Sequence, residues 1–98
     1  MSTHVVAVSG VDSAPLEDGG VVLFHPTSGK FLMLNRSTAV LWAELQVPRT
    51  EDELARTLCE SFPGLPMTTA LEDAHGAVER LGQLELLSLE EQAVTETS

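Results

Sequence analysis

The fold is decided by residues 21–45, which read VVLFHPTSGKFLMLNRSTAVLWAEL. Two apolar runs are separated by turn chemistry, because Pro26 fixes φ and Gly29 tolerates a positive φ. Apolar residues at helical spacing follow directly after the second run. The stretch therefore predicts a hairpin docked on a helix, with elements at about Val21–His25, Lys30–Asn35 and Ser37–Gln46.

The residues before the hairpin divide into an apolar run and a polar one. His4–Val8 contains β-branched residues and predicts a first strand. Ser9–Gly20 is rich in serine, aspartate, proline and glycine, which is typical of a loop. We therefore expect three strands before the first helix.

Local chemistry marks the start of the first two helices. Asn35 or Ser37 is placed to cap the first helix. Thr50 and Glu53 have the spacing of a capping box, in which each side chain bonds the backbone N–H of the other residue. The apolar stripe that follows predicts a second helix over about Glu51–Phe62.

A third helix is predicted after the Pro63–Pro66 break. Thr68 or Thr69 is placed to cap it, and Gly82 is a plausible stop after Leu81. Its apolar stripe comprises Leu71, Ala74, Val78 and Leu81, and the leucines that return to the core afterwards are Leu84, Leu86, Leu87 and Leu89.

The element order predicts an α+β fold of winged helix-turn-helix type. A three-stranded antiparallel sheet is followed by three helices, and no linker divides the chain. We expect residues 3–89 to form one domain and residues 90–98 to form a disordered acidic tail.

The acidic composition limits the partners that the protein can have. The formal net charge is −10, with only five Lys and Arg residues. A nucleic-acid-binding surface needs basic residues that neutralise phosphates, so nucleic acid is excluded as the expected partner. No apolar run is long enough to cross a membrane, and the N-terminus lacks the pattern of a signal peptide. We expect a cytoplasmic protein with protein or peptide partners and no membrane partner.

The sequence contains no catalytic or metal-binding pattern. Its three histidines and its single cysteine, Cys59, are scattered over different predicted elements, without the short spacing of zinc ligands. No glycine-rich phosphate loop precedes a helix. We therefore expect no enzyme activity and no cofactor.

The third strand has the properties of a binding edge. Lys30 is its only charge and it contains no proline, so it is poorly protected against pairing with another chain. Leu32 and Leu34 point to one face, and Phe31 and Met33 to the other. A bound segment, a second copy of the chain or packing under the Ser9–Gly20 loop are alternative covers for that second face.

The sequence resembles the PqqD-like family over roughly Val5 to Leu89. The resemblance rests on short segments spread along the chain, which are Gly20–Phe24, Thr27–Phe31, Leu34-Asn35, Ala39–Trp42, Thr50–Leu54 and Leu81–Leu84. Members of the family are small peptide-recognition domains in the biosynthesis of ribosomally made, post-translationally modified peptides. They bind the precursor's leader as an extended segment on strand three, beside helix three.

The resemblance implies a non-catalytic protein that delivers a leader peptide to a maturation enzyme, such as a leader protease. A stand-alone acidic domain is similar to the leader-binding protein of lasso-peptide pathways. The alternatives are a peptide chaperone of pyrroloquinoline quinone biosynthesis that serves a radical SAM enzyme, and an acidic winged-helix regulator. The implied peptide-binding residues are Lys30, Phe31, Leu32, Met33, Leu34, Glu72, Asp73, Ala74, Val78 and Leu81.

Overall fold

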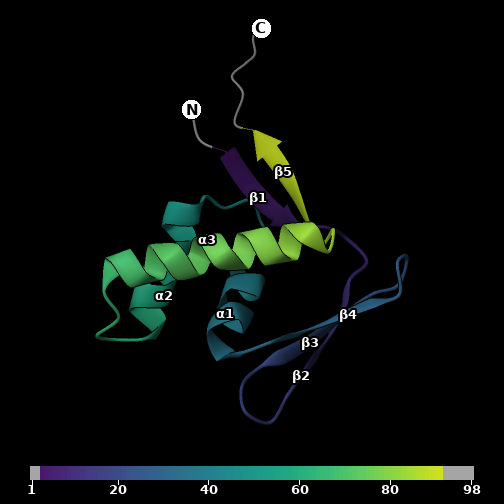
Figure 1. Ribbon diagram of the computed structural model, residues 1–98, viewed down its shortest axis with the longest axis horizontal. Coiled ribbons are helices and arrows are strands. Elements are labelled where there is room, and N and C mark those ends of the chain that lie inside the picture. Colours follow the sequence, from purple (N-terminus) through teal and green to yellow (C-terminus); the bar gives the residue numbers. More distant parts are fainter. Residues whose placement is uncertain (1–2, 92–98) are drawn as a thin grey trace, which may run out of the picture.

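Three helices lie on one side of a small antiparallel sheet, and a separate two-stranded ribbon holds the two ends of the described chain together (Figure 1). The computed structural model describes residues 3–91. No helix within this range is long and apolar enough to span a membrane. The elements are β1 (Thr3–Ala7), β2 (Asp12–Pro15), β3 (Val21–His25), β4 (Lys30–Leu34), α1 (Arg36–Glu44), α2 (Glu51–Ser61), α3 (Met67–Gln83) and β5 (Leu87–Glu91).

The three-stranded antiparallel sheet is confirmed, but one of its strands was not predicted. The strand order is β2-β3-β4, and β3 pairs with both neighbours. Strand β2 lies within Ser9–Gly20, which the sequence predicted as a loop. That prediction was wrong because β2 is exposed along its whole length and has no apolar pattern that would mark it as a strand. It is defined by its backbone pairing with β3.

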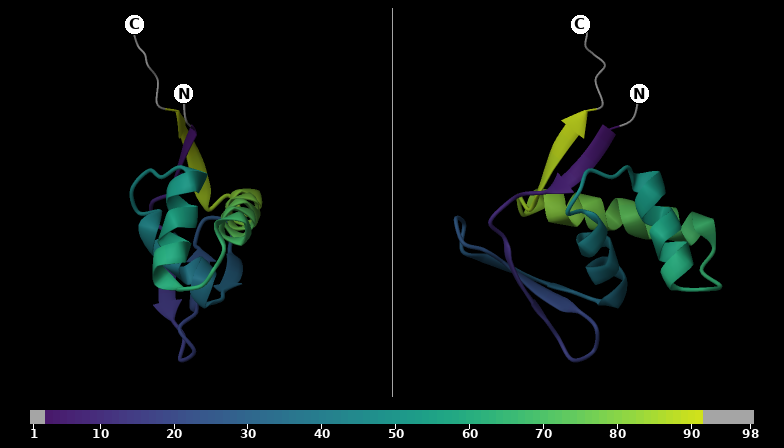
Figure 2. Two further views of the ribbon diagram at one scale, coloured as in Figure 1. Left: turned by 90° about the vertical axis from the view of Figure 1, so that its left-hand side faces the viewer. Right: turned by 180° about the vertical axis from the view of Figure 1, so that it is seen from behind.

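The predicted first strand exists as β1, but it pairs with β5 instead of the hairpin. On its other side, Val5 and Arg49 exchange backbone hydrogen bonds of 2.8 and 2.9 Å. Figure 2 shows the resulting ribbon projecting away from the sheet. Strand β5 continues to Glu91, two residues beyond the predicted domain end at Leu89. The rest of the predicted tail, residues 92–98, lies outside the described residues.

The core lies between the helices and the inner face of the sheet. Leu23 and Leu34 contribute from the sheet, while α3 contributes mainly small residues. Small side chains allow helices to approach closely, and α3 makes its most extensive contacts with α2. The buried residues are Val5, Leu23, Leu34, Leu41, Trp42, Leu45, Leu54, Ala55, Leu58, Ala70, Ala74, Ala77, Leu81 and Leu86.

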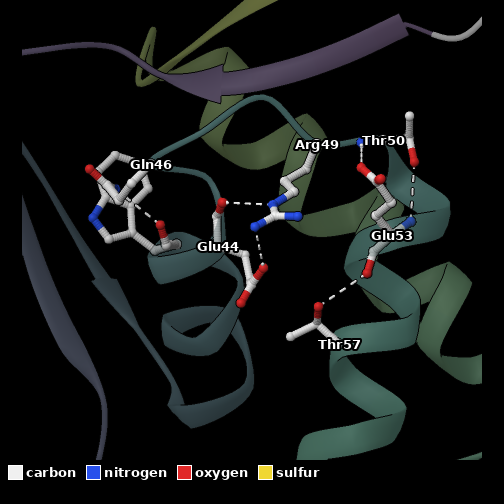
Figure 3. A network of polar contacts seen from close by, with 7 residues as sticks. Glu44, Gln46, Arg49, Thr50, Glu53 and Thr57 are labelled. Carbon is white, nitrogen blue, oxygen red and sulfur yellow. Dashed lines mark hydrogen bonds and ion pairs between the residues drawn. The ribbon is translucent and has the colours of Figure 1, made fainter.

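Two of the predicted helix caps are present. The side chain of Asn35 accepts a hydrogen bond of 2.9 Å from the backbone N–H of Thr38. At the start of α2, Thr50 and Glu53 form the predicted capping box (Figure 3), with bonds of 2.9 and 3.2 Å. The backbone N–H of Thr50 holds the pKa of the Glu53 carboxyl below its usual range.

The predicted ends of α3 were wrong. Pro66 is the residue before its first turn, and no side chain caps that turn, so neither Thr68 nor Thr69 has the expected role. Gly82 lies inside the helix, which ends at Gln83. Proline suits the start of a helix because its fixed φ is compatible with helical geometry and a missing N–H costs nothing there.

Arg49 joins the loop after α1 to the ribbon. Its Nε donates a hydrogen bond of 3.2 Å to the carbonyl oxygen of Glu44, and its guanidinium lies 3.1 Å from the Glu44 carboxylate (Figure 3). Since the Arg49 backbone also bonds Val5, one residue connects α1 with β1.

His75 links α3 to the first turn of α2. Its Nδ1 lies 3.1 Å from a carboxylate oxygen of Glu51, and its Nε2 lies 3.3 Å from Glu79. The hydrogen bond and the charge of Glu51, followed by the charge of Glu79, raise the pKa of His75 above its ordinary value of about 6.5. The protonated imidazole is therefore favoured in the folded state.

We expect His75 to make stability depend on pH in one direction. A raised folded-state pKa contributes stability below the unfolded value, and this contribution is lost as pH rises through the folded value. Urea unfolding of the wild type and of His75→Gln, from about pH 6 to about pH 9, should show the wild type losing its advantage with rising pH. Parallel pH profiles would contradict this assignment.

Candidate functional site

Strand β4 forms one edge of the central sheet. Strand β4 lies at the end of the order β2-β3-β4, and no strand of residues 3–91 pairs with its outer side. The edge therefore presents backbone donors and acceptors to solvent, as the sequence suggested for Lys30–Leu34.

Pro15 determines which backbone groups of β4 face outward. It has no N–H, and it lies opposite Val21, so this must be a non-hydrogen-bonded pair of the β2–β3 ladder. The polar groups of Val21 then face β4, where its partner is Leu34. Since the orientation alternates along a strand, Leu34 and every second residue before it point to β3. The N–H and C=O groups of Phe31 and Met33 consequently point outward.

A glycine at the end of the neighbouring turn supports the same orientation. A Cβ atom on Gly20, directly before β3, would collide with the carbonyl oxygen of Leu34. That carbonyl therefore faces the β3 side of the strand. Two independent features, a proline and a glycine, thus assign the same backbone register to β4.

The side chains of β4 also divide between its two faces. Leu34 is 4% exposed and lies in the core, whereas Phe31 and Met33 are 68% and 66% exposed. Phe31 packs on Phe24 of β3, with ring centroids 4.8 Å apart. The Ser9–Gly20 segment leaves these side chains largely uncovered, although residues of β2 line a small hollow beside Phe31. The outer sheet face therefore remains apolar and open.

A hollow of about 330 Å³ lies next to the C-terminal end of β4. Asn35 directly follows β4 and forms part of its wall, so the hollow lies where a chain running along the edge would leave the strand. The start of α1 faces α3 across it. The lining residues are Asn35, Ser37, Thr38, Glu72, Asp73, Gly76, Ala77 and Arg80.

The structure separates the α3 residues that the sequence had grouped together. Glu72 and Asp73 line the hollow and are exposed. Ala74 and Leu81 have no exposed surface, so the expectation that they offer anchors on the groove is corrected: both belong to the core. Val78 is half-buried and lines a different hollow, beside Val5 and Leu89 on the ribbon.

The helical period explains this separation. Asp73, Ala77 and Arg80 lie one residue before Ala74, Val78 and Leu81, which rotates them by about 100° around the helix axis. Residues of the predicted stripe were expected to contact the ligand, whereas the stripe belongs to the core, where α3 packs mainly on α2. The flank beside that stripe forms the wall of the hollow.

Sequence reasoning missed six residues of the hollow. Asn35 was identified only as a helix cap, and Gly76 was not among the residues expected at the site. The one signal in the sequence was a glycine within the predicted third helix, where alanine would be more favourable. The missed residues are Asn35, Ser37, Thr38, Gly76, Ala77 and Arg80.

Within residues 3–91, no group of three or more His, Cys, Asp or Glu side chains is arranged to hold a metal ion. Cys59 is partly buried, and its thiol lies 3.5 Å from the carbonyl oxygen of Leu65. The β4 edge offers main-chain hydrogen bonding, with the exposed side chains of Phe31 and Met33 on one face and a polar hollow next to its C-terminal end.

Comparisons with known proteins identify a matching family and a shared fold. Residues 20–87 match the family described as coenzyme PQQ synthesis protein D (PqqD). The structure of TbiB1 in complex with the TbiA(beta) leader peptide shares the fold, with a TM-score of 0.71 and 25% identity over 91% of this chain and 99% of that chain. Lasso peptide synthetase B1 complexed with the leader peptide matches with a TM-score of 0.70 and 20% identity, over 86% of this chain and 96% of that one. No curated protein matches the sequence significantly.

We expect the two faces of β4 to respond differently to truncation. Replacing the exposed Met33 by serine should change the free energy of unfolding by no more than about 0.5 kcal/mol. Replacing the buried Leu34 by alanine should cost about 2–5 kcal/mol, since it leaves a cavity in the core. Urea denaturation of both variants measures the difference, and a large loss in Met33→Ser would contradict the assignment of an open face.

Proposed function

The chain belongs to the PqqD family, and from this premise we propose that it binds the leader segment of a ribosomally made precursor peptide without catalysing a reaction. The observation that carries the proposal is the open β4 edge, with the backbone groups of Phe31 and Met33 directed outward. The leader adds to the sheet there as a further strand.

Other strand edges of the described chain suit this role less well. Strand β2 has four residues and ends in Pro15, which cannot donate a hydrogen bond. Strand β5 contains Glu90 and Glu91 in its five residues. Strand β4 has only Lys30 as a charge, no proline, and an apolar outer face beside it.

An added strand has side chains on both faces of the sheet. Those on the outer face lie beside Phe31 and Met33 and bury apolar surface on binding. Those on the other face point toward the helical layer. Main-chain pairing supplies affinity for any extended segment, while these side chains select the leader.

The molecular charge suits such a ligand and opposes DNA binding. A net charge of −10 attracts basic segments of a peptide and repels a phosphate backbone. The winged-helix regulator considered from the sequence is therefore the weaker alternative.

We place the protein in a lasso-peptide pathway, where it hands the leader to a maturation enzyme such as a leader protease. This rests on the near end-to-end match with TbiB1, which was solved with a leader peptide bound, and on the resemblance of the sequence to the lasso type. A chaperone role in pyrroloquinoline quinone biosynthesis is the alternative, and the description of the matching family favours it.

The first expected result is selective binding of the leader. In a fluorescence-polarisation titration with the precursor peptide encoded beside this chain, the leader half should bind saturably and the core half should not. Incubation with the protein alone should leave both halves uncleaved. Absence of binding by either half at tens of micromolar would overturn the proposed function.

Strand addition predicts a specific effect of proline at position 33. Met33→Pro removes an outward N–H that the leader would use, so binding should weaken at least about tenfold, beyond any effect of Met33→Ala, which removes the side chain alone. Proline at Leu32 is not an equivalent test, because that N–H faces β3. Circular dichroism must show that Met33→Pro remains folded. Equal affinities of Met33→Pro and Met33→Ala would contradict pairing at this position.

A further inference from the structure

Gly76 occupies a position where the fold of the free chain does not require glycine. It lies in the interior of α3 on the wall of the 330 Å³ hollow. A Cβ atom added there would meet no atom within 4 Å. Its φ is not positive, unlike those of Gly10, Gly19, Gly29 and Gly64. Neither packing nor backbone conformation in the described chain therefore accounts for the missing side chain.

Glycine in a helix interior is unfavourable compared with alanine, because its backbone loses more freedom on folding. At Gly76 this loss has no compensating contact within the chain. The remaining physical advantage of glycine is that it allows another main chain to come close to the helix. Because Gly76 lines the hollow, that main chain would approach the helix through the hollow.

We propose that Gly76 is the point at which the bound leader's main chain packs directly against α3. This inference rests on the proposed function. A peptide added to β4 that continues past Leu34 reaches the hollow bounded by Asn35 and Gly76. There it leaves the sheet edge and passes between the start of α1 and α3. A side chain at position 76 would fill the space that the peptide needs.

The hollow also defines the class of leader residue that fits at this point. Its rim carries the carboxylates of Glu72 and Asp73, the guanidinium of Arg80 and the polar groups of the α1 start. These groups hydrogen-bond polar side chains and would be left unpaired against an apolar one. The leader residue beside Gly76 is therefore polar, in contrast to those that lie over Phe31 and Met33.

Gly82 provides a matched control on the same helix. It is also helical, its φ is not positive, and a Cβ atom there would also meet nothing within 4 Å. Gly82 does not line the hollow. Substitution of either glycine by alanine should therefore affect the free protein in the same direction and the complex differently.

The test compares Gly76→Ala and Gly82→Ala in thermal unfolding and in leader titration. Both variants should melt higher than the wild type, Gly76→Ala by roughly 4–8 °C for a domain of this size and Gly82→Ala by less, because Gly82 is the last residue but one of α3. Gly76→Ala should weaken leader binding by roughly fivefold or more, since overpacking a close contact is unfavourable. Gly82→Ala should bind as the wild type does, and Gly76→Gln should bind more weakly than Gly76→Ala.

The possible outcomes separate this inference from the proposed function. If the wild type fails to bind the leader, the proposed function falls and the role of Gly76 falls with it. If the wild type binds and Gly76→Ala binds equally well, only the role of Gly76 is overturned. A lower melting temperature for Gly76→Ala would also overturn it, because the fold itself would then require the glycine.

Discussion

The rest of the structure depends on the junction between Leu34 and Asn35. Leu34 is buried beneath the helices, while its carbonyl group faces the β3 side of the strand. The next residue caps α1 through its side chain, so strand and helix meet without a linker. This junction fixes the position of the β4 edge relative to the helices. It also leaves the hollow between the start of α1 and α3, because α3 packs chiefly on α2 and makes few contacts with the sheet.

The β4 edge combines two features that natural sheets usually avoid. An unpaired edge with one charge and a large apolar face beside it promotes association with other chains. Here the net charge of −10 opposes association between copies, since each repels the next. Repulsion between identical acidic chains does not act on a neutral or basic peptide. The net charge of the protein thus opposes self-association at the β4 edge and still allows a neutral or basic peptide to pair there. No protective residue on the edge itself is needed for this.

The elements that could be predicted are those whose signals are local. The hairpin follows from Pro26 and Gly29, and the capping box follows from residues three positions apart. Strand β2 and the β1–β5 ribbon could not be predicted, because backbone pairing with a distant partner defines them. At the site, the edge strand was predicted, whereas the hollow was not. Its walls come from the start of α1 and from α3, and the hydrophobic stripe of α3 gave no indication that the neighbouring flank lines a hollow there.

The ribbon has a consequence for how this unit can be joined to other proteins. Thr3 pairs with Glu91, so the two ends of the described chain emerge side by side, at the opposite side of the molecule from the sheet (Figure 1). A domain with adjacent ends can be inserted into a surface loop of a host without stretching either partner. Such an insertion would leave the β4 edge and the hollow facing away from the host. The fold is thus suited to serve as a portable peptide-binding module as well as a separate protein.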